Sequence, residues 1–245
     1  MTEWAGRRYW IVGASEGLGR ALAEQLSRFG ARLVLSARGE DRLHDLARAL
    51  PGHADVVPVD VSDRDSVRDA AAAAGEIDGL VYLAGVWWSH SAREWDADKV
   101  EKMLDINLMG AARVLGHVVP PMVARDRGHV VLTGSLAAYR GLPRTIGYSA
   151  SKAGIASLAE SMRADLAGTG VKVQLVNPGF IKTRMTDKND FPMPQLMSAQ
   201  DAAAEMAEHM STDAFRRNFP AGLATAVRFG QLLPDWAYTR IFPRK

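Results

Sequence analysis

The stretch RYWIVGASEGLGRALAEQLSRFG, residues 8–30, decides the fold of this chain. It begins as a short apolar strand, passes through Gly13, Gly17 and Gly19, and enters an amphipathic helix that ends at Gly30. Glycines permit positive φ and a close approach of the backbone, and the amides at a helix start attract a phosphate. A plain tight turn is the alternative. The position of the turn between a strand and a helix favours the phosphate site.

Strand-like and helix-like segments alternate along the rest of the chain. Further apolar strands are expected at residues 32–36, 56–61, 77–83, 128–133 and 171–176. Helical patterns lie between them, at residues 41–50, 65–74, 98–125 and up to about 166. Near-continuous apolar strands separated by helices indicate a buried parallel sheet. We therefore predict an α/β fold of one Rossmann-type domain over residues 1–245, a doubly wound parallel β-sheet flanked by helices on both faces.

The composition limits the classes of function. The chain has 245 residues, of which 47% are hydrophobic, and this is enough for one large core. With 30 basic and 28 acidic residues it is no polycation, so nucleic-acid binding is not expected. The absence of cysteine excludes disulfides and thiolate zinc sites, and the six histidines lack metal-ligand spacing, so no metal site is predicted. Without a signal-peptide pattern or a spanning apolar run, a cytoplasmic protein is expected.

The end of the second strand bears on the choice of cofactor. In dinucleotide-binding folds an acidic residue there binds the adenosine ribose, whereas a basic residue accommodates a 2′-phosphate. Here Ala37 and Arg38 occupy the position, which favours NADP over NAD. Glu16 argues the other way, because a carboxylate in the glycine turn would repel that phosphate. The alternative for Arg38 is a solvated arginine at a helix start.

A second motif has the residue types of proton-transfer chemistry. Tyr148 and Lys152 are four residues apart and share one face if the segment is helical, and Ser135 lies thirteen residues upstream at the end of a strand. A cation beside a phenol favours the phenolate, which lowers the tyrosine pKa toward the range of a general acid or base. An ordinary helix face is the alternative. Asn107, inside a helical region, is either a tolerated surface residue or present for its amide.

Together these motifs make residues 7–210 closely similar to the short-chain dehydrogenase/reductase family. The glycine turn matches the family's Thr-Gly-x-x-x-Gly-x-Gly pattern, except that Val12 replaces the threonine. Ala84-Gly85 match the end of the Asn-Asn-Ala-Gly motif, and Tyr82-Leu83 replace both asparagines. The resemblance therefore implies backbone contacts to the cofactor at this motif without the asparagine side chains.

The family's catalytic tetrad is matched completely, by Asn107, Ser135, Tyr148 and Lys152. The resemblance implies that Ser135 orients and polarises the substrate oxygen while Tyr148 gives or takes its proton. Lys152 would lower the tyrosine pKa and bind the nicotinamide ribose, and Asn107 would hold the water that links Lys152 to solvent. Hydride transfer itself belongs to the nicotinamide.

The resemblance also implies a set of cofactor-binding residues. Asp60 matches the aspartate that contacts the adenine, and Pro178-Gly179 with Thr183 match the segment that holds the nicotinamide amide. The predicted cofactor-binding residues are Gly13, Ser15, Gly17, Leu18, Gly19, Arg38, Asp60, Val61, Ala84, Gly85, Tyr148, Lys152, Pro178, Gly179, Ile181 and Thr183.

These observations predict an NAD(P)-dependent carbonyl reductase or alcohol dehydrogenase, with NADP preferred over NAD. It would transfer hydride between the nicotinamide and a lipophilic ketone or secondary alcohol, as a homodimer or homotetramer. The alternative is a catalytically silent dinucleotide-binding regulatory or scaffold protein, and the intact tetrad favours the enzyme.

Substrate choice is expected in a lid, in two tryptophans and in the tail. The resemblance implies a mobile lid at about residues 184–200, with the apolar side chains Met185, Phe191, Met193, Leu196 and Met197. Trp87 and Trp88 follow the fourth strand and either line the substrate pocket or form core or subunit contacts.

The tail, residues 214–245, is basic and rich in aromatic side chains. Leu223, Val227 and Leu233 can share a helical stripe within it. We expect the tail to pack over the substrate cleft or a partner subunit, and contact with a membrane surface is the less favoured alternative.

Overall fold

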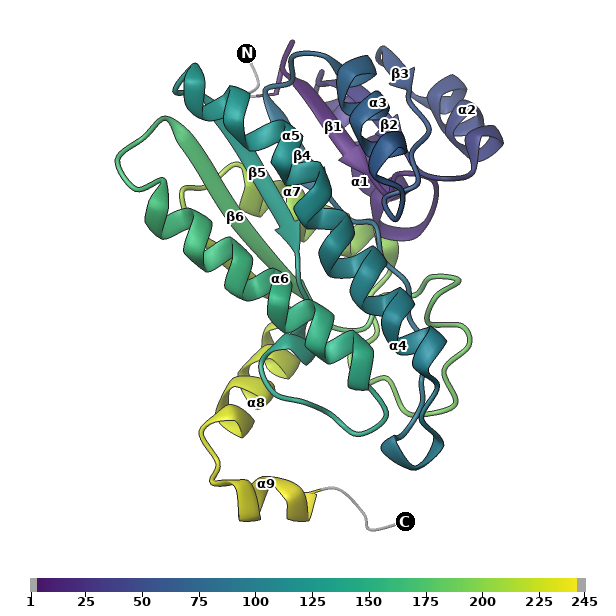
Figure 1. The fold of residues 1–245 in the computed structure, drawn as a ribbon, viewed down its shortest axis with the longest axis vertical. Coiled ribbons are helices and arrows are strands. Elements are labelled where there is room, and N and C mark those ends of the chain that lie inside the picture. The colour runs from purple at the N-terminus through teal and green to yellow at the C-terminus, as the bar shows by residue number, and fades with distance from the viewer. Residues whose placement is uncertain (1–3, 242–245) are drawn as a thin grey trace.

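Seven parallel strands form one sheet in the computed structural model, which describes residues 4–241 (Figure 1). Their order is β3-β2-β1-β4-β5-β6-β7, so the chain winds one way from β1 and then returns to wind the other way from β4. The strands are β1 (Arg8–Val12), β2 (Arg32–Ser36), β3 (Ala54–Val56), β4 (Gly79–Tyr82), β5 (Gly128–Thr133), β6 (Val171–Pro178) and β7 (Arg216–Phe219). The predicted doubly wound α/β fold is confirmed, and its winding reverses between β1 and β4, where such sheets bind ligands.

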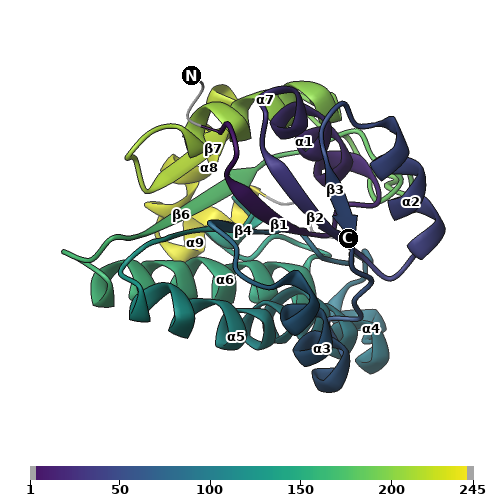
Figure 2. The ribbon, with the colours of Figure 1, turned by 90° about the horizontal axis from the view of Figure 1, so that it is seen from above.

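Helices cover both faces of the sheet (Figure 2). One face carries α1, α2 and α7, and the other carries α3, α4, α5 and α6. The helices are α1 (Gly17–Arg28), α2 (Glu40–Ala49), α3 (Arg64–Ala74), α4 (Ala97–Leu104), α5 (Gly110–Ala124), α6 (Ile146–Asp165), α7 (Ala199–Met210), α8 (Ala221–Gln231) and α9 (Asp235–Ile241). None of the helices within residues 4–241 combines the length and apolar character that crossing a bilayer requires.

The strands are apolar throughout because both of their faces are buried. Along β1, Tyr9 and Ile11 pack among the residues of α1 and α7, while Trp10 and Val12 pack among those of α3 and α5. All four are at most 1% exposed. Successive side chains of a strand point to opposite faces, so a sheet covered on both sides needs an apolar residue at every position.

The third strand differs from its predicted position. It was expected at residues 56–61, but β3 ends at Val56. The backbone amide of Val57 still donates to the carbonyl group of Leu35 in β2 at 3.0 Å, and that of Val59 donates to Ala37, just after β2, at 3.1 Å. Because these two amides point toward β2, the nitrogen of Pro58 faces the open edge of the sheet, where a missing N–H removes no bond to β2. The carbonyl oxygen of Val57 accepts from the Ser36 hydroxyl, and the extended chain continues along β2 beyond the end of the strand.

The strand β7 was not predicted. It lies at the start of the tail and pairs in parallel with β6, from Leu175 opposite Arg216 to Pro178 opposite Phe219. Its sequence Arg-Arg-Asn-Phe lacks an apolar alternation, and only Phe219 is buried. An edge strand with polar side chains gives no period-2 signal, so only the pairing partner β6 identifies it.

A chain of buried polar groups crosses the sheet beneath α7. The Tyr9 hydroxyl lies 2.9 Å from His129 Nδ1, and His129 Nε2 lies 2.8 Å from Gln174 Oε1. The Gln174 amide nitrogen donates to the carbonyl group of His209 in the last turn of α7 and to those of Thr212 and Ala214 in the loop before β7. Burial lowers the pKa of His129 to about 3, so the imidazole is neutral at physiological pH.

This histidine is expected to make the fold sensitive to acid. Its pKa is about 6.5 in an unfolded chain and about 3 in the fold, so its stabilising effect is complete above pH 6.5 and is lost as pH falls toward 3. As pH falls from 7 to 5, the titration of His129 is expected to lower the free energy of unfolding by about 2 kcal/mol. Urea titrations across this range would measure the slope, with His129→Gln as the comparison. An equal slope in the variant would contradict the assignment.

Candidate functional site

The glycine turn between β1 and α1 leaves no room for side chains. A Cβ atom at Gly13 would lie 2.6 Å from the backbone nitrogen of Ala84, and one at Gly19 would lie 2.1 Å from the carbonyl oxygen of Gly13. Gly13 and Gly17 adopt positive φ values of 100° and 56°. No side chain caps the start of α1 at Glu16, so the first-turn amides stay open toward a ligand. The turn fits a phosphate group.

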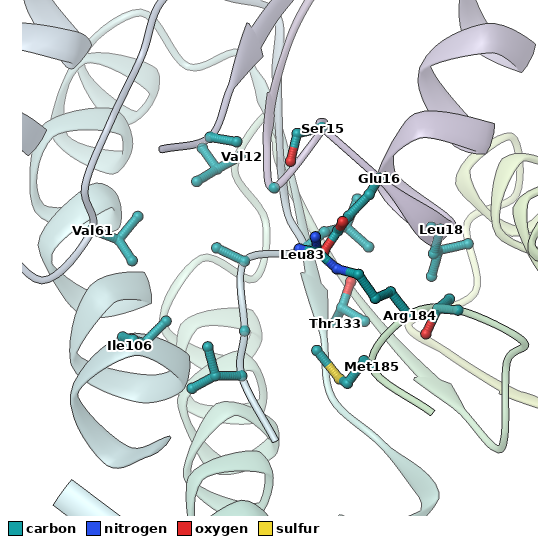
Figure 3. A pocket seen from close by; sticks show the side chains of 18 of the residues that line it. Val12, Ser15, Glu16, Leu18, Val61, Leu83, Ile106, Thr133, Arg184 and Met185 are labelled. Carbon is teal, nitrogen blue, oxygen red and sulfur yellow. The ribbon is translucent and has the colours of Figure 1, made fainter. Parts of the chain in front are cut away.

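A cavity of about 270 Å³ lies over this turn at the carboxyl ends of the strands (Figure 3). Every residue that the sequence analysis assigns to cofactor binding lines it. The lining also includes residues that were not assigned, among them Arg42, Ile106, Thr133, Arg184 and Met185. These come from helices, strand ends and the lid, and no short sequence motif connects them to the glycine turn.

Charged side chains meet at the end of the cavity beside β2. Glu16 was expected to repel a 2′-phosphate, but it pairs with Arg184 at 2.9 Å and with Arg42 at 3.3 Å. Figure 3 shows Glu16 and Arg184 directed toward each other across the cavity. Two arginines thus balance its charge, while Arg38 also lines the cavity without an ion pair to any described residue. The local charge is therefore positive rather than negative.

Asp60 borders the same end of the cavity and is ionised. Burial acts to raise its pKa, but hydrogen bonds from the hydroxyl and backbone amide of Ser62 outweigh this effect. The nearby charges of Arg38 and Arg113 add to them, so the pKa of Asp60 lies below its usual value. Asp60 therefore presents a carboxylate held in place by its own turn.

The replaced asparagine motif has a different arrangement. Tyr82 points away from the cavity and donates from its hydroxyl to the carbonyl oxygen of Ile106, at 2.7 Å. The Tyr82 hydroxyl has room for this position because residue 110 is a glycine, since a Cβ there would lie only 2.5 Å from the hydroxyl oxygen. Leu83, Ala84 and the following glycine line the cavity. The replacement thus leaves the backbone contact at Ala84 available and ties β4 to the helix that carries Asn107.

Tyr148 and Lys152 line the cavity, and Ser135 lies beside Tyr148 within hydrogen-bonding reach. Ser135 follows β5, and its Oγ accepts a hydrogen bond from the amide of Ala137 at 3.1 Å. Tyr148 and Lys152 lie on α6, with Lys152 Nζ 5.8 Å from the centre of the Tyr148 ring. Lys152 Nζ donates to the carbonyl oxygen of Thr133 at 2.8 Å. The end of β5 and one face of α6 therefore bring Ser135, Tyr148 and Lys152 close together, and the shared helix face is the one that the four-residue spacing predicted.

The electrostatics differ from the prediction that Lys152 lowers the pKa of Tyr148. Burial raises the pKa of Tyr148, and a hydrogen bond with Ser135 opposes this only in part. Burial also lowers the pKa of Lys152 to about 8. The predicted lowering is wrong for this state, because the lysine lies over the ring and bonds to a backbone carbonyl rather than to the phenol. Tyr148 therefore keeps its proton at neutral pH.

Asn107 is fully buried and is present for its amide rather than as a surface residue. Its Oδ1 accepts from the amide of Val86 at 2.7 Å, and its Nδ2 donates to the Val86 carbonyl at 3.1 Å and to Ser151 Oγ at 3.0 Å. It lies in the π-helical turn Asp105–Met109 between α4 and α5. Such turns recur at functional sites.

Ser151 is a positioning residue that the sequence analysis did not identify. It is fully buried, and its hydroxyl also donates to the carbonyl oxygen of Tyr148 at 2.8 Å. It therefore links Asn107 to the helical turn that presents the phenol. Its position within the Tyr-Ser-Ala-Ser-Lys segment was visible in the sequence, but its partner is 44 residues away.

Trp87 connects the tetrad to the lid. Its ring packs against the edge of Tyr148, with centroids 5.0 Å apart, and its Nε1 donates to Asn189 Oδ1 at 2.9 Å. Asn189 in turn donates to the sulfur of Met193 at 3.2 Å. Trp87 thus lies directly beside Tyr148, whereas among the described residues the Trp88 side chain forms no hydrogen bond or ring contact with the tetrad.

A buried hydroxyl group in the cavity wall is available to a ligand. Thr133 Oγ1 is buried in the cavity wall and has no hydrogen-bond partner among the described residues. At the glycine turn, the start of α1 has no side-chain cap, and Gly13 and Gly19 have no room for a Cβ, which suits a ligand that accepts hydrogen bonds from backbone amides. The residues present therefore fit a phosphate-containing ligand that reaches Tyr148 and Lys152.

Comparison with known proteins agrees with this geometry. The model of the family described as short chain dehydrogenase matches residues 8–192. An uncharacterized oxidoreductase of Myxococcus xanthus is 39% identical over 242 residues, covering 96% of each chain. A 3-oxoacyl-(acyl-carrier-protein) reductase of Rickettsia conorii is 29% identical over 188 residues, covering 77% of this chain and 78% of its own.

A solved structure shows the same likeness in three dimensions. The short chain dehydrogenase/reductase of Burkholderia phymatum, in complex with NAD, superposes with a TM-score of 0.85 at 27% identity. The match covers 93% of this chain and 94% of that one. A nicotinamide dinucleotide is accordingly the type of cofactor that this fold and site accommodate. With the fold, the glycine turn and the tetrad in agreement, the chain belongs to the short-chain dehydrogenase/reductase family.

Proposed function

We propose that the protein is an NADP-dependent carbonyl reductase that acts on a lipophilic ketone and, in reverse, oxidises the secondary alcohol. The observation that carries the proposal is the proximity of Ser135 to Tyr148, which lines the cavity together with Lys152. Burial raises the pKa of Tyr148, so the phenol carries the proton that reduction of a carbonyl group needs.

Each residue of the site has a separate role in the proposed reduction of a carbonyl group. The nicotinamide supplies the hydride when it is bound. Ser135 donates a hydrogen bond to the carbonyl oxygen and holds it beside Tyr148, which transfers the phenolic proton to that oxygen. Lys152 is charged below about pH 8 and stabilises the phenolate that remains. The buried amide of Asn107 and the Ser151 hydroxyl hold the backbone around this centre.

The proposed activity is tested by turnover. Purified protein with NADPH is expected to reduce aromatic and long-chain ketones, monitored by the loss of absorbance of NADPH. NADPH fluorescence on binding provides a separate readout. Binding without turnover on any ketone or alcohol of a broad panel would instead favour a silent dinucleotide-binding protein.

The preference for NADP is proposed to depend on Arg38 and Arg42. Both line the cavity beside β2, and Arg42 reaches Glu16. A 2′-phosphate gains charge-assisted hydrogen bonds from arginine that the ribose hydroxyl of NAD does not. Replacing Arg38 by alanine is expected to raise KM for NADPH about tenfold with little change for NADH, and the double change with Arg42→Ala about a hundredfold.

The matched control for this experiment is Arg48→Ala, which removes an arginine of α2 outside the cavity lining. It should leave both KM values unchanged. An unaltered ratio of KM for NADPH and NADH in Arg38→Ala and in the double variant would show that these arginines do not select the cofactor.

The lid is proposed to select lipophilic substrates. Met193 is half-buried beside Asn189, Leu196 is 42% exposed, and both lie in the segment that Trp87 connects to Tyr148. Replacing both by serine removes apolar surface and is expected to raise KM for bulky apolar ketones about tenfold or more. KM for a small ketone should change little. Equal effects on bulky and small ketones would contradict a selective lid.

A further inference from the structure

The two last helices present an apolar surface to solvent. Of the eleven large hydrophobic side chains that are exposed among the described residues, five lie between residues 229 and 241. We call them the α8–α9 surface: Phe229, Leu232, Leu233, Trp236 and Ile241. Leu232 is 79% exposed, Phe229 67% and Trp236 64%. Helix α9 buries no residue and α8 buries only Ala224, and Figure 1 shows both helices extending beyond the sheet.

The charges beside this surface are positive. Arg228 and Arg240 are exposed, and neither forms an ion pair within residues 4–241. Arg240 lies over the Trp236 ring, 5.3 Å from its centre. The single acid of the two helices, Asp235, is neutralised by Arg140 at 2.5 Å. The exposed apolar side chains therefore stand among uncompensated cations.

The two helices are held in this position by contacts to one loop. Arg140 donates to the carbonyl oxygens of Gly230 and Leu233, at 3.1 and 2.6 Å, and stacks 3.9 Å from the centre of the Tyr238 ring. The Tyr238 hydroxyl donates to the carbonyl of Gly141 at 3.0 Å. These contacts use the polar groups of α8 and α9 on the protein side, so the apolar side chains remain outward.

We propose that the α8–α9 surface docks on a lipid surface that carries negative charge. Aromatic and aliphatic side chains with interspersed arginines are the composition of helices that lie in the membrane interface. A second copy fits less well, because a two-fold contact places the same patch against itself and would bring Arg228 and Arg240 of both copies together. Charge complementarity thus favours an anionic lipid headgroup as the partner.

The base of this surface adjoins the lid and the cavity. Leu223 at the start of α8 lies against Gly179, where a Cβ would be 3.0 Å from its Cδ2, and its amide donates to Gln195 of the lid at 3.0 Å. A docked protein would hold its substrate side near the lipid, which suits a lipophilic ketone. That last step rests on the proposed function, whereas docking itself does not.

Vesicle sedimentation of the full chain tests the proposal. The vesicles are phosphatidylcholine with and without phosphatidylglycerol. We expect binding to the anionic vesicles that weakens as salt is raised. Replacing Phe229, Leu232 and Trp236 together by serine should lower the partition coefficient about a hundredfold. Changing Arg228 and Arg240 to glutamine should lower it about 25-fold, at about fivefold for each cation, and remove most of the salt dependence.

Trp95→Ser is the matched control, since this tryptophan is 59% exposed but lies outside the α8–α9 surface. It should bind vesicles like the wild type. NADPH fluorescence, which does not depend on lipid, checks that each variant is folded. Equal vesicle binding by the triple-serine variant and the wild type would overturn the proposal. So would absence of vesicle binding combined with a dimer, seen by light scattering, that the triple-serine change dissociates.

Discussion

Replacing Tyr148 by phenylalanine is expected to lower kcat for ketone reduction at least about a thousandfold, because the substitution removes the proton that the carbonyl oxygen must receive. The ring itself stays, so its packing against Trp87 at 5.0 Å and its position near Lys152 persist. Affinity for NADPH is therefore expected to change little. Steady-state rates with NADPH and a reactive ketone, together with NADPH fluorescence titration, would separate the two effects.

Tyr139→Phe is the matched control. It removes one phenolic hydroxyl nine residues earlier, which donates to Asn218 Oδ1 at 2.9 Å outside the cavity lining. Turnover of this variant should stay within about threefold of the wild type. If Tyr148→Phe retained comparable turnover, another group would have to supply the proton, and the proposed mechanism would fail.

Replacing Gly19 by alanine is expected to abolish dinucleotide binding and to destabilise the fold by about 3 kcal/mol or more. The added Cβ would lie 2.1 Å from the Gly13 carbonyl oxygen and 3.1 Å from the Ala14 Cα, so α1 must move away from the turn. Backbone cannot rotate aside as a flexible side chain can. Thermal unfolding and NADPH titration would measure the two losses.

Gly116→Ala is the control for this substitution. Gly116 lies within α5, and a Cβ there would meet nothing within 4 Å. Alanine is the better helix former, so stability is expected to rise by about 0.5–1 kcal/mol with cofactor binding unchanged. If Gly19→Ala bound NADPH with wild-type affinity, the glycine turn would have room for a Cβ, and the proposed close packing at Gly19 would be contradicted.

Local patterns predicted most of the sheet and the glycine turn because each depends on neighbouring residues. An apolar strand, a turn with Gly13, Gly17 and Gly19, and an amphipathic helix are visible within 23 residues. The edge strand β7 was missed, since its polar sequence becomes a strand only by pairing with β6. The third strand was placed too late because the apolar pattern continues past Val56, where the strand ends.

In the candidate site, too, features that depend on neighbouring residues were predicted and features that depend on distant residues were not. The spacing of Tyr148 and Lys152 indicated a shared helix face, but not that both would be buried, with the pKa of the phenol raised instead of lowered. Glu16 was interpreted as a repulsive charge until Arg42 and Arg184, which is 168 residues away, were found beside it. Charge balance and desolvation depend on distant neighbours that a local pattern does not contain.

The sequence by itself determined the class of fold, the dinucleotide turn and the identity of the four proposed catalytic residues. The fold and the turn follow from local patterns, whereas the four residues were identified together by their resemblance to the family's tetrad. The tertiary structure alone decided the raised pKa of Tyr148, the burial of Asn107 with Ser151, the contact of Trp87 with the lid, and the outward apolar surface of α8 and α9. Each of these properties depends on which distant segments exclude water from a group, and burial arises only when the chain is folded.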